Sequence, residues 1–382
     1  MEKSKKILLF IDNLGSGGAQ RQICNVGVLL KKSGYDVEVL VYQDYPFYKP
    51  LLDANQIPIT LVETKGKVSR IVRIRKYINK VNPYAVIAFL ETPCFIACIS
   101  KIFGKKWKLI TTERSAKETT FNLRRNKFFN LFERFSSAKV ANSYNAIKMW
   151  RKYYPQYNKK YSVIYNPIII PNEFTEIEHD YKEDNKIKLV VAASYQELKN
   201  PLGVIEALNL LTDEQKKKIE INWYGRAEIE IGNTRIFDLA VEKVQEYGLE
   251  NLIHLNGETK EIYKKMAESD VVGLFSTVEG LPNVICEGMT IGRPIVMSKV
   301  SDFDVLVNGN GYLCDPHSVE SIRDALVNLI ETPADELAKM GEKSKEKAKE
   351  LFSAEVIKKQ WIDIIENIPS EGWSSIAPKK RE

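Results

Sequence analysis

The chain is poor in the residues that build metal centres and disulfide frameworks. It has five cysteines, an odd and scattered set, and only three histidines among 382 residues. Cys94 and Cys98 could share a helix face, but no histidine or further cysteine lies nearby, and no Asp-x-Asp pair is placed at the end of an expected strand. We therefore expect core thiols in a reducing compartment, no metal ion and no histidine-based chemistry.

Long hydrophobic runs are also missing. The first six residues lead directly into an expected strand, with no apolar signal region. The most apolar stretch, 86–103, is interrupted by Glu91, Pro93 and Lys101, which favours a buried strand followed by a helix over a membrane span. With 44% hydrophobic and 28% charged residues, the composition is that of a globular protein, and we expect a cytoplasmic location.

Charge is unevenly distributed along the chain. Residues 1–180 contain 30 Lys and Arg against 15 Asp and Glu, whereas residues 181–382 contain 26 against 35. A basic first half favours phosphate-bearing partners such as lipid headgroups, pyrophosphate carriers or nucleic acid, although a solvated charge run is the alternative. No known nucleic-acid-binding motif is present, so we expect no nucleic-acid partner.

Strand and helix patterns alternate in both halves of the chain. Short apolar runs are followed by helical spacing, such as that of Ala19, Ile23 and Leu30. This alternation predicts an α/β protein with parallel, doubly wound sheets. The expected strands cover 7–11, 37–42, 85–90, 108–112 and 139–142, and a second alternating unit opens at 187–193.

Composition and spacing predict a linker between the two halves, and helices followed by a tail at the end of the chain. An acidic, unpatterned segment, 173–184, is typical of an interdomain linker. Three amphipathic helices are expected over 318–330, 334–352 and 354–365. The last residues, 370–382, carry Ser-rich and Pro-rich patches and a basic cluster, and we expect this tail to be mobile.

Two glutamates eight positions apart, Glu279 and Glu287, stand in the most informative segment. An apolar run, 270–276, precedes them, and a turn with another apolar run, 292–298, follows. This order predicts a βαβ unit whose site lies at the carboxyl end of the first strand. Carboxylates suit sugar and ribose hydroxyls, and a helix start suits phosphate. Two solvated surface acids are the alternative.

The segment 269–298 resembles the C-terminal core of the retaining GT-B glycosyltransferases of glycosyltransferase family four. That family's pattern is an apolar strand, then Ser-x-x-Glu-Gly-x-Pro-x-x-x-x-Glu, then Gly-x-Pro-Ile/Val-Val, and its motifs occur here in order between residue 7 and about residue 365. The resemblance implies two Rossmann-like domains facing a central cleft. It places an acceptor-binding domain at 1–170, a nucleotide-sugar-binding domain at 185–352, and a terminal helix that returns to the first domain, with the tail, at 353–382.

The same resemblance assigns roles in the second domain. Glu287 would bind the ribose hydroxyls and Glu279 would face the transferred sugar. The backbone around the sugar hydroxyls would be shaped by Gly280, Leu281, Pro282 and Asn283. The family retains the anomeric configuration without a metal ion, so we assign no nucleophile and no cofactor other than the donor substrate.

Two strand-to-helix turns are expected to meet the donor diphosphate or the acceptor. Gly17 and Gly18 allow close backbone approach at a helix start, although a plain tight turn is the alternative. The matching turn of the second domain includes Ser194, Lys199 and Asn200. The family usually has Gly-Arg-x-x-x-x-Lys-Asn here. Lys199 and Asn200 fit that pattern, but Ser194 or Tyr195 stands where the arginine belongs, and Arg226 is a candidate to compensate.

One position in the first half departs from the common family pattern. Many members carry a histidine after the strand at 108–112, whereas this chain has Glu113 and Arg114. We take Glu113 as a catalytic candidate beside Glu279 and Lys199, with a salt-bridged loop as the alternative. Further on, the spacing of Phe121, Phe128, Leu131, Phe132 and Phe135 predicts one helix over 121–135 with an apolar stripe. Arg124, Arg125 and Lys127 flank it and could meet an anionic membrane surface.

The sequence therefore predicts a retaining, metal-independent glycosyltransferase. It would move a hexose or N-acetylhexosamine from a nucleoside-diphosphate sugar, preferably a UDP-sugar, to a polysaccharide or polyprenyl-pyrophosphate-linked glycan. We expect a cytoplasmic protein, peripheral at the inner face of the cytoplasmic membrane. One alternative is a GT-B nucleotide-sugar epimerase, but this chain lacks the array of histidines that such an enzyme would use. The other alternative is a non-catalytic nucleotide-sugar-binding protein.

Overall fold

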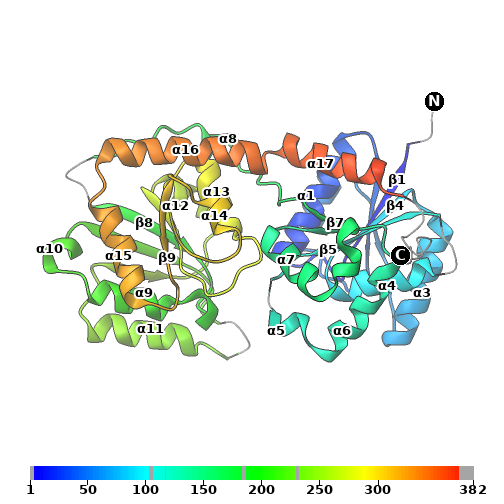
Figure 1. The fold of residues 1–382 in the computed structure, drawn as a ribbon, viewed down its shortest axis with the longest axis horizontal. Helices are drawn as coiled ribbons and strands as arrows, with labels where there is room; N and C mark the ends of the chain where they lie inside the picture. Colours follow the sequence, from blue (N-terminus) through cyan, green and yellow to red (C-terminus); the bar gives the residue numbers. More distant parts are fainter. Residues whose placement is uncertain (1–3, 103–105, 117, 183–185, 229–231, 370–382) are drawn as a thin grey trace, which may run out of the picture. The chain divides into compact units, whose positions relative to one another are not determined.

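The chain folds as two compact units, each a parallel sheet with helices packed on it (Figure 1). A computed structural model describes residues 4–102, 106–116, 118–182, 186–228 and 232–369. The first unit combines the chain up to Pro167 with the chain from Ala354 onward, and the second unit is Ile168–Ser353. The predicted α/β architecture, with a parallel sheet in each of two units, is thereby confirmed.

The sheet of the first unit has the strand order β3-β2-β1-β4-β5-β6-β7, with every neighbour pair parallel. The interior strand β1 is apolar from Ile7 to Phe10, as expected where helices cover both faces of a sheet, and Leu8 and Leu9 are fully buried. The strands are β1 (Lys6–Phe10), β2 (Asp36–Val41), β3 (Ile59–Leu61), β4 (Ala85–Ala88), β5 (Lys108–Glu113), β6 (Ala138–Ala141) and β7 (Tyr161–Val163).

The helices of the first unit include one from the far end of the chain. Buried Trp361 and Ile365 pack α17 into this unit, where it contacts α1. The Glu366 carboxylate at its end accepts hydrogen bonds from the hydroxyls of Tyr35 and Tyr84 at 2.6 and 3.0 Å. The predicted return of the terminal helix is therefore observed. The helices are α1 (Gly18–Lys32), α2 (Lys49–Ala54), α3 (Lys67–Val81), α4 (Glu91–Lys101), α5 (Glu118–Phe121), α6 (Arg124–Asn130), η1 (Leu131–Phe135), α7 (Tyr144–Tyr153), η2 (Pro155–Lys160) and α17 (Ala354–Asn367).

The sheet of the second unit has the order β10-β9-β8-β11-β12-β13 and is also parallel. Its strands are β8 (Ile187–Ala192), β9 (Ile219–Tyr224), β10 (Ile253–Asn256), β11 (Val271–Leu274), β12 (Ile295–Ser298) and β13 (Gly311–Cys314). Its helices are α8 (Asn172–Thr175), η3 (Glu197–Lys199), α9 (Pro201–Asn209), α10 (Asp213–Lys216), α11 (Arg235–Glu246), α12 (Ile262–Ala267), α13 (Asn283–Ile291), α14 (Phe303–Leu306), α15 (Val319–Ile330) and α16 (Ala334–Phe352). The strand order reverses between β8 and β11, where open α/β sheets bind ligands.

Two expectations from the sequence are wrong, and one falls outside the structure. The segment 173–184 was expected to be a linker, but its described part packs on the second unit: His179 Nε2 lies 2.6 Å from the Asp270 carboxylate, and α8 contacts α12 and α13. The helix expected over 121–135 is broken into α5, α6 and η1, and Phe128 and Leu131 are 52% and 59% exposed. The tail 370–382 lies outside the described residues.

Candidate functional site

The loops that follow β8 and β11 are joined at the point where the strand order of the second unit reverses. The backbone N–H of Thr277 donates to the carbonyl of Leu198 at 2.9 Å. One residue further along the first loop, the Lys199 ammonium lies 2.5 Å from Glu279 Oε1, and the two side chains are 20% and 14% exposed. The structure therefore brings two of the predicted site residues together as a part-buried ion pair.

Asn200 fixes the end of the loop that carries Lys199. It adopts the left-handed conformation, with φ of 61°, at the start of α9. Its side-chain amide donates to the carbonyl of Pro316 at 2.9 Å, which ties this turn to the loop after β13. Asparagine tolerates this conformation better than most residues, so Asn200 holds the turn in place.

The loop between Glu279 and Glu287 is fixed by its neighbours. The carbonyls of Ser276 and Gly280 accept hydrogen bonds from the hydroxyls of Ser298 and Ser301, the first at 2.6 Å. Leu281 and Pro282 are buried, Asn283 opens α13, and Glu287 stands one turn later with 6% of its surface exposed. The two carboxylates therefore occupy different depths, Glu279 in the loop and Glu287 within the helix.

Where the family usually has an arginine, this chain has the half-buried Ser194 and the buried Tyr195. Ser194 Oγ accepts from the Gln196 amide at 2.9 Å, and Tyr195 is 1% exposed, with its hydroxyl donating to Asn256 O at 2.9 Å. Arg226 lies beside them, because the Tyr195 N–H donates to its carbonyl at 3.0 Å. A Cβ on Gly225 would come within 1.9 Å of Ala193 O, so only glycine allows this approach. The Arg226 side chain is exposed.

In the first unit, Gly17 and Gly18 lie at the start of α1, as expected. Gly17 is the N-cap residue, and a Cβ there would come within 2.3 Å of Gln20 Oε1. The Gln20 amide also donates to the carboxylate of Asp12 at 3.3 Å, just beyond β1. Burial raises the pKa of Asp12, although hydrogen bonds from Asn13 and Gln20 oppose the shift.

Glu113 lies at the end of β5, and its carboxylate is fixed by hydrogen bonds from residues of the first unit. Its Oε1 accepts from the backbone N–H groups of Arg114 and Ser115, both at 3.0 Å, and its Oε2 accepts from Trp150 Nε1 at 2.9 Å. Burial raises the pKa of this carboxyl, opposed by the charge of Lys139 and by the Trp150 hydrogen bond. These donors give Glu113 a clear role in fixing the loop, and its catalytic role stays a prediction.

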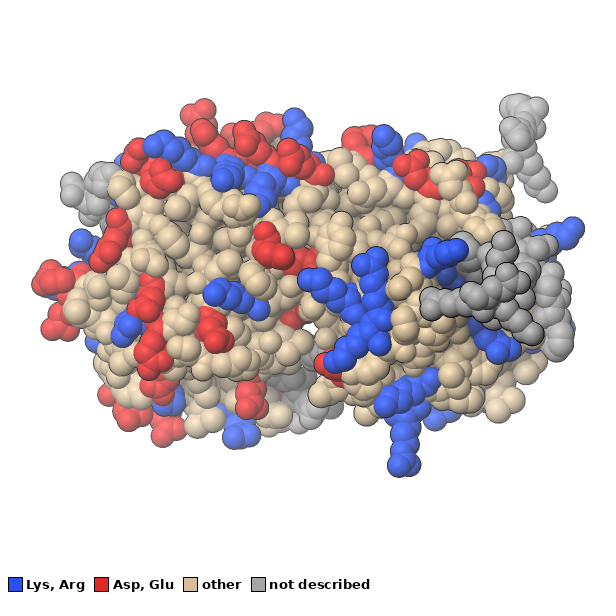
Figure 2. Space-filling model, in the orientation of Figure 1, with Lys and Arg blue, Asp and Glu red and all other residues tan. Residues whose placement is uncertain are grey.

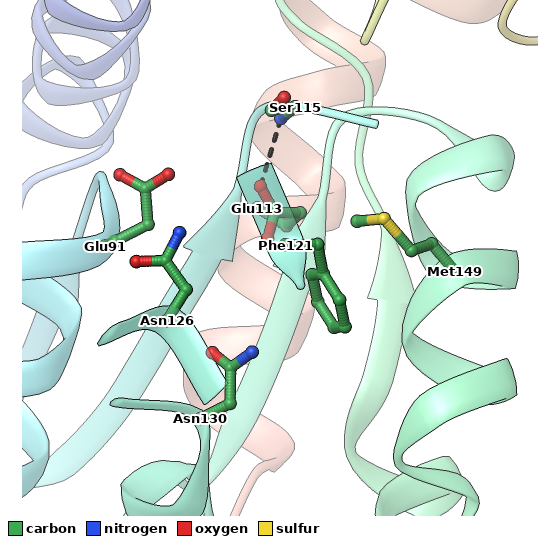
Figure 3. Close-up of a pocket in the computed structure, with 7 residues that line it drawn as sticks. All are labelled: Glu91, Glu113, Ser115, Phe121, Asn126, Asn130 and Met149. Atoms are coloured by element: carbon green, nitrogen blue, oxygen red, sulfur yellow. Dashed lines mark hydrogen bonds between the residues drawn. The ribbon is translucent and has the colours of Figure 1, made fainter. Parts of the chain in front are cut away.

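Glu113 also lines a small cavity of the first unit, shown in Figure 3. The volume of about 20 Å³ is enough for one water molecule. Glu91, Asn126 and Asn130 turn polar groups toward it from α4 and α6, and the remaining lining residues are Ser115, Phe121 and Met149.

Sequence reasoning missed Asp12, Glu91, Asn126 and Asn130. Asp12 could have been found, because it is the first acid after a buried strand. Glu91 was seen only as an interruption of an apolar run, although it opens α4 at the carboxyl end of β4. The two asparagines do not follow an apolar strand, so no pattern marks them. They lie within 121–135, where a single continuous helix was expected.

Metal and membrane features were searched in the described part of the chain. No group of three or more His, Cys, Asp and Glu side chains there could hold a metal ion. An Asp-x-Asp pair that the sequence analysis passed over, Asp302 and Asp304, lies at the start of α14, four residues beyond β12. None of the described helices is both long enough and apolar enough to cross a membrane.

Comparison with known proteins identifies the class. Residues 173–347 match the family model described as Glycosyl transferases group 1. This match covers the loops after β8 and β11 and the Lys199–Glu279 pair. Residues 173–347 are therefore a domain of this group, the two units have the GT-B fold, and the resemblance read from the sequence is confirmed.

Individual relatives are distant but cover most of the chain. An N-acetyl-alpha-D-glucosaminyl L-malate synthase of Bacillus anthracis is 23% identical over 75% of this chain and 73% of its own length. An N-acetylgalactosamine-N,N'-diacetylbacillosaminyl-diphospho-undecaprenol 4-alpha-N-acetylgalactosaminyltransferase of Campylobacter jejuni is 23% identical over 76% of this chain and 80% of its own. The crystal structure of Anabaena HepE in complex with UDP superposes with a TM-score of 0.79 at 19% identity, covering 95% of this chain and 100% of that one.

Proposed function

We propose that this protein is a retaining glycosyltransferase that moves a hexose or N-acetylhexosamine from a UDP-sugar to a glycan acceptor of surface polysaccharide biosynthesis. The observation that carries the proposal is the Lys199–Glu279 pair, which joins the two loops at the strand-order reversal. A cation and a carboxylate at this point match the two charged requirements of a sugar diphosphate, a partner for phosphate and an acceptor for hydroxyl hydrogens.

The donor would be held as follows. Lys199 leaves Glu279 and pairs with the diphosphate, where it stabilises the charge that develops as the bond to the sugar breaks. Glu279 then accepts hydrogen bonds from the sugar hydroxyls, and Glu287 accepts them from the ribose. After the exchange, Lys199 is paired with the anion of the donor and Glu279 is hydrogen-bonded to sugar hydroxyls, so neither charged group lacks a polar partner.

Arg226 supplies the second positive charge that the family usually takes from an arginine in the loop after β8. Its backbone is hydrogen-bonded to Tyr195, and its exposed side chain lies at the carboxyl end of β9. Together with Lys199 it would neutralise the diphosphate without a metal ion or any cofactor beyond the donor.

The acceptor is proposed from the relatives. The Bacillus anthracis enzyme acts on L-malate and the Campylobacter jejuni enzyme on a diphospho-undecaprenol-linked sugar, according to their names. We favour the lipid-linked type because the first half of this chain is strongly basic, with 30 Lys and Arg against 15 Asp and Glu in residues 1–180.

Membrane docking through α6 completes the proposal. Arg124, Arg125 and Lys127 are exposed on this helix, and Leu123 and Phe128 beside them are 51% and 52% exposed. Figure 2 shows Lys and Arg gathered on the face of the first unit that the view presents. Basic groups with exposed apolar side chains suit an anionic lipid surface, which would place the enzyme peripherally at the cytoplasmic leaflet.

The test is incubation of the full chain with a panel of labelled nucleotide sugars, with a strong chelator in half of the samples. Slow release of free sugar with retained anomeric configuration, unaffected by the chelator, is the expected result. Epimerised nucleotide sugar would indicate the isomerase alternative, and binding without turnover even with lipid-linked acceptors would indicate a sensor. Activity that the chelator abolishes and manganese restores would contradict the metal-independent mechanism.

A further inference from the structure

Arg114 lies at the carboxyl edge of the first unit's sheet, and two of its three guanidinium nitrogens have no hydrogen-bond partner in the described structure. Its Nη1 donates to Asn166 Oδ1 at 3.0 Å, and its guanidinium carbon lies 4.1 Å from the centre of the Phe89 ring. Nε and Nη2 are both buried, and no acceptor among the described residues is within hydrogen-bond reach of either. These two atoms form the edge of the guanidinium that binds oxyanions through two parallel hydrogen bonds.

The charge of Arg114 is also unpaired, because no carboxylate of the described chain forms an ion pair with it. The neighbouring Glu113 carboxylate accepts hydrogen bonds from two backbone N–H groups and from Trp150. Burial lowers the pKa of Arg114 to about 9, which shows that its surroundings disfavour the charge. The nearby Glu113 charge favours the cation but does not outweigh burial, so an anion bound at Nε and Nη2 would lower the cost of burying this charge.

Other unused polar groups lie on the same face of the sheet. Side chains alternate along a strand, and Thr112 pairs with Val140. Arg114 and Asn142 lie two residues beyond this pair, just past the ends of β5 and β6, where the same alternation places them on the face of Thr112. Thr112 Oγ1 and Asn142 Oδ1 are buried and also have no hydrogen-bond partner in the described structure, and both residues are 4% exposed. Unsatisfied groups of this kind on three neighbouring residues are unusual in a folded protein.

We propose that Arg114 is the centre of an oxyanion site in the first unit, which binds a phosphate or carboxylate group of a substrate through Nε and Nη2. The proposal rests on the proposed function only for the source of the anion. The source is either the acceptor, as a lipid-linked diphosphate or a small carboxylate, or the diphosphate of the donor. The chemistry at Arg114 is the same in both cases.

The test is an NMR titration of the full chain labelled with ¹⁵N at arginine, in which the Nε–H signal of Arg114 is followed as inorganic phosphate is added at constant ionic strength. Arg114→Lys assigns the signal and keeps the charge while removing the fork. We expect a saturable shift of the Arg114 signal, with no shift of the signal of Arg151, an exposed arginine on α7. Phosphate should also raise the melting temperature of the wild-type chain. The apparent phosphate affinity obtained from this rise should be at least about tenfold weaker in Arg114→Lys and unchanged in Arg151→Lys.

A second titration with UDP identifies the source. Phosphate that still shifts the Arg114 signal after saturation with UDP indicates an acceptor group, whereas UDP that shifts the signal itself indicates the donor diphosphate. An Arg114 signal that responds to neither anion, while UDP binds elsewhere, overturns the oxyanion site and leaves the proposed function standing. If Arg114→Lys does not fold, Arg114→Gln assigns the signal, and the titration of the wild-type chain then decides. Phosphate binding at Arg114 without any UDP binding would support this site and count against the UDP donor.

Discussion

At the scale of single residues, the chemistry of the second unit depends on how charges are paired before the donor arrives. Lys199 and Glu279 are separated by 80 positions in the chain and lie 2.5 Å apart in the fold. A part-buried charge is costly without a partner, so each side chain keeps the other in place. Under the proposed function, the ion pair is the resting arrangement, which the anionic donor replaces.

Glu279→Ala is expected to lower turnover more than donor affinity. The carboxylate is proposed to contact the transferred sugar, and losing a part-buried charged hydrogen bond costs roughly 1.5–3 kcal/mol, or about 10–100-fold in rate. Steady-state kinetics with a UDP-sugar would measure both parameters. Glu342→Ala, which changes an exposed acid on α16, serves as the control. Unchanged kcat in Glu279→Ala would remove this residue from the reaction.

Arg226→Gln is expected to raise the KM for the donor about tenfold, because one charge-assisted contact to the diphosphate is lost. The matched control is Arg323→Gln on α15, where the arginine pairs with Asp324. Equal KM values in the two variants would show that Arg226 does not compensate for the missing arginine.

At the scale of elements, long amphipathic helices and fully buried strands were predictable, and partly buried strands were not. The helices expected over 318–330 and 334–352 match α15 and α16 to within one residue. The strands β3, β7, β9, β10 and β13 were not predicted, and in each of them at least half of the residues are only partly buried or exposed. Such strands lack the continuous apolar run by which the buried strands were recognised.

The site was predictable as far as its motifs reached. Turn residues and the family pattern located the loops that carry Lys199 and Glu279 and the helix that carries Glu287, but contacts between distant loops leave no local signal in one sequence. The same limit explains the wrong prediction at 121–135. Aromatic spacing fits a continuous helix, whereas in the structure Phe121 packs on Trp150 and Phe129 stacks on Phe95, in two separate clusters.

Glu366→Gln is expected to loosen α17. Burial opposes ionisation of Glu366, but hydrogen bonds from Lys5, Tyr35 and Tyr84 hold its pKa at about 2. Since the unfolded value is about 4.3, the ionised carboxylate stabilises the fold above roughly that pH, and this contribution is lost as the pH falls toward 2.

Urea unfolding should therefore show a loss of about 1 kcal/mol in Glu366→Gln at pH 7, and this difference should shrink below about pH 4.3. Glu355→Gln, on the same helix, removes an acid whose side chain is 80% exposed and should have no measurable effect. A difference between Glu366→Gln and wild type that is constant between pH 7 and pH 3 would contradict the ionic role of this carboxylate.

At the scale of the whole molecule, the uneven charge predicts where the enzyme works. Liposome flotation should show binding of the full chain to anionic vesicles at low salt and its release at high salt. Replacing Arg124, Arg125 and Lys127 with Gln should abolish most of the binding, because each contributes about 1 kcal/mol near an anionic surface.

The control for flotation changes the same number of charges elsewhere. Lys339, Lys343 and Lys349 are exposed on α16 of the second unit, and their replacement with Gln should leave flotation unchanged. Absence of binding at low salt, or equal loss in both triple variants, would favour an acceptor that is not membrane-bound.

The donor site of the second unit is tested most directly by calorimetric titration of UDP into the full chain and into Glu287→Ala. Glu287 is buried one turn into α13 and is proposed to bind the ribose. Wild-type protein should bind one UDP per chain, and the variant should bind it at least about tenfold more weakly, as the loss of a buried charged hydrogen bond requires. Equal affinity in the two proteins, or no binding of UDP by the wild type, would contradict a UDP-sugar site at the loops after β8 and β11.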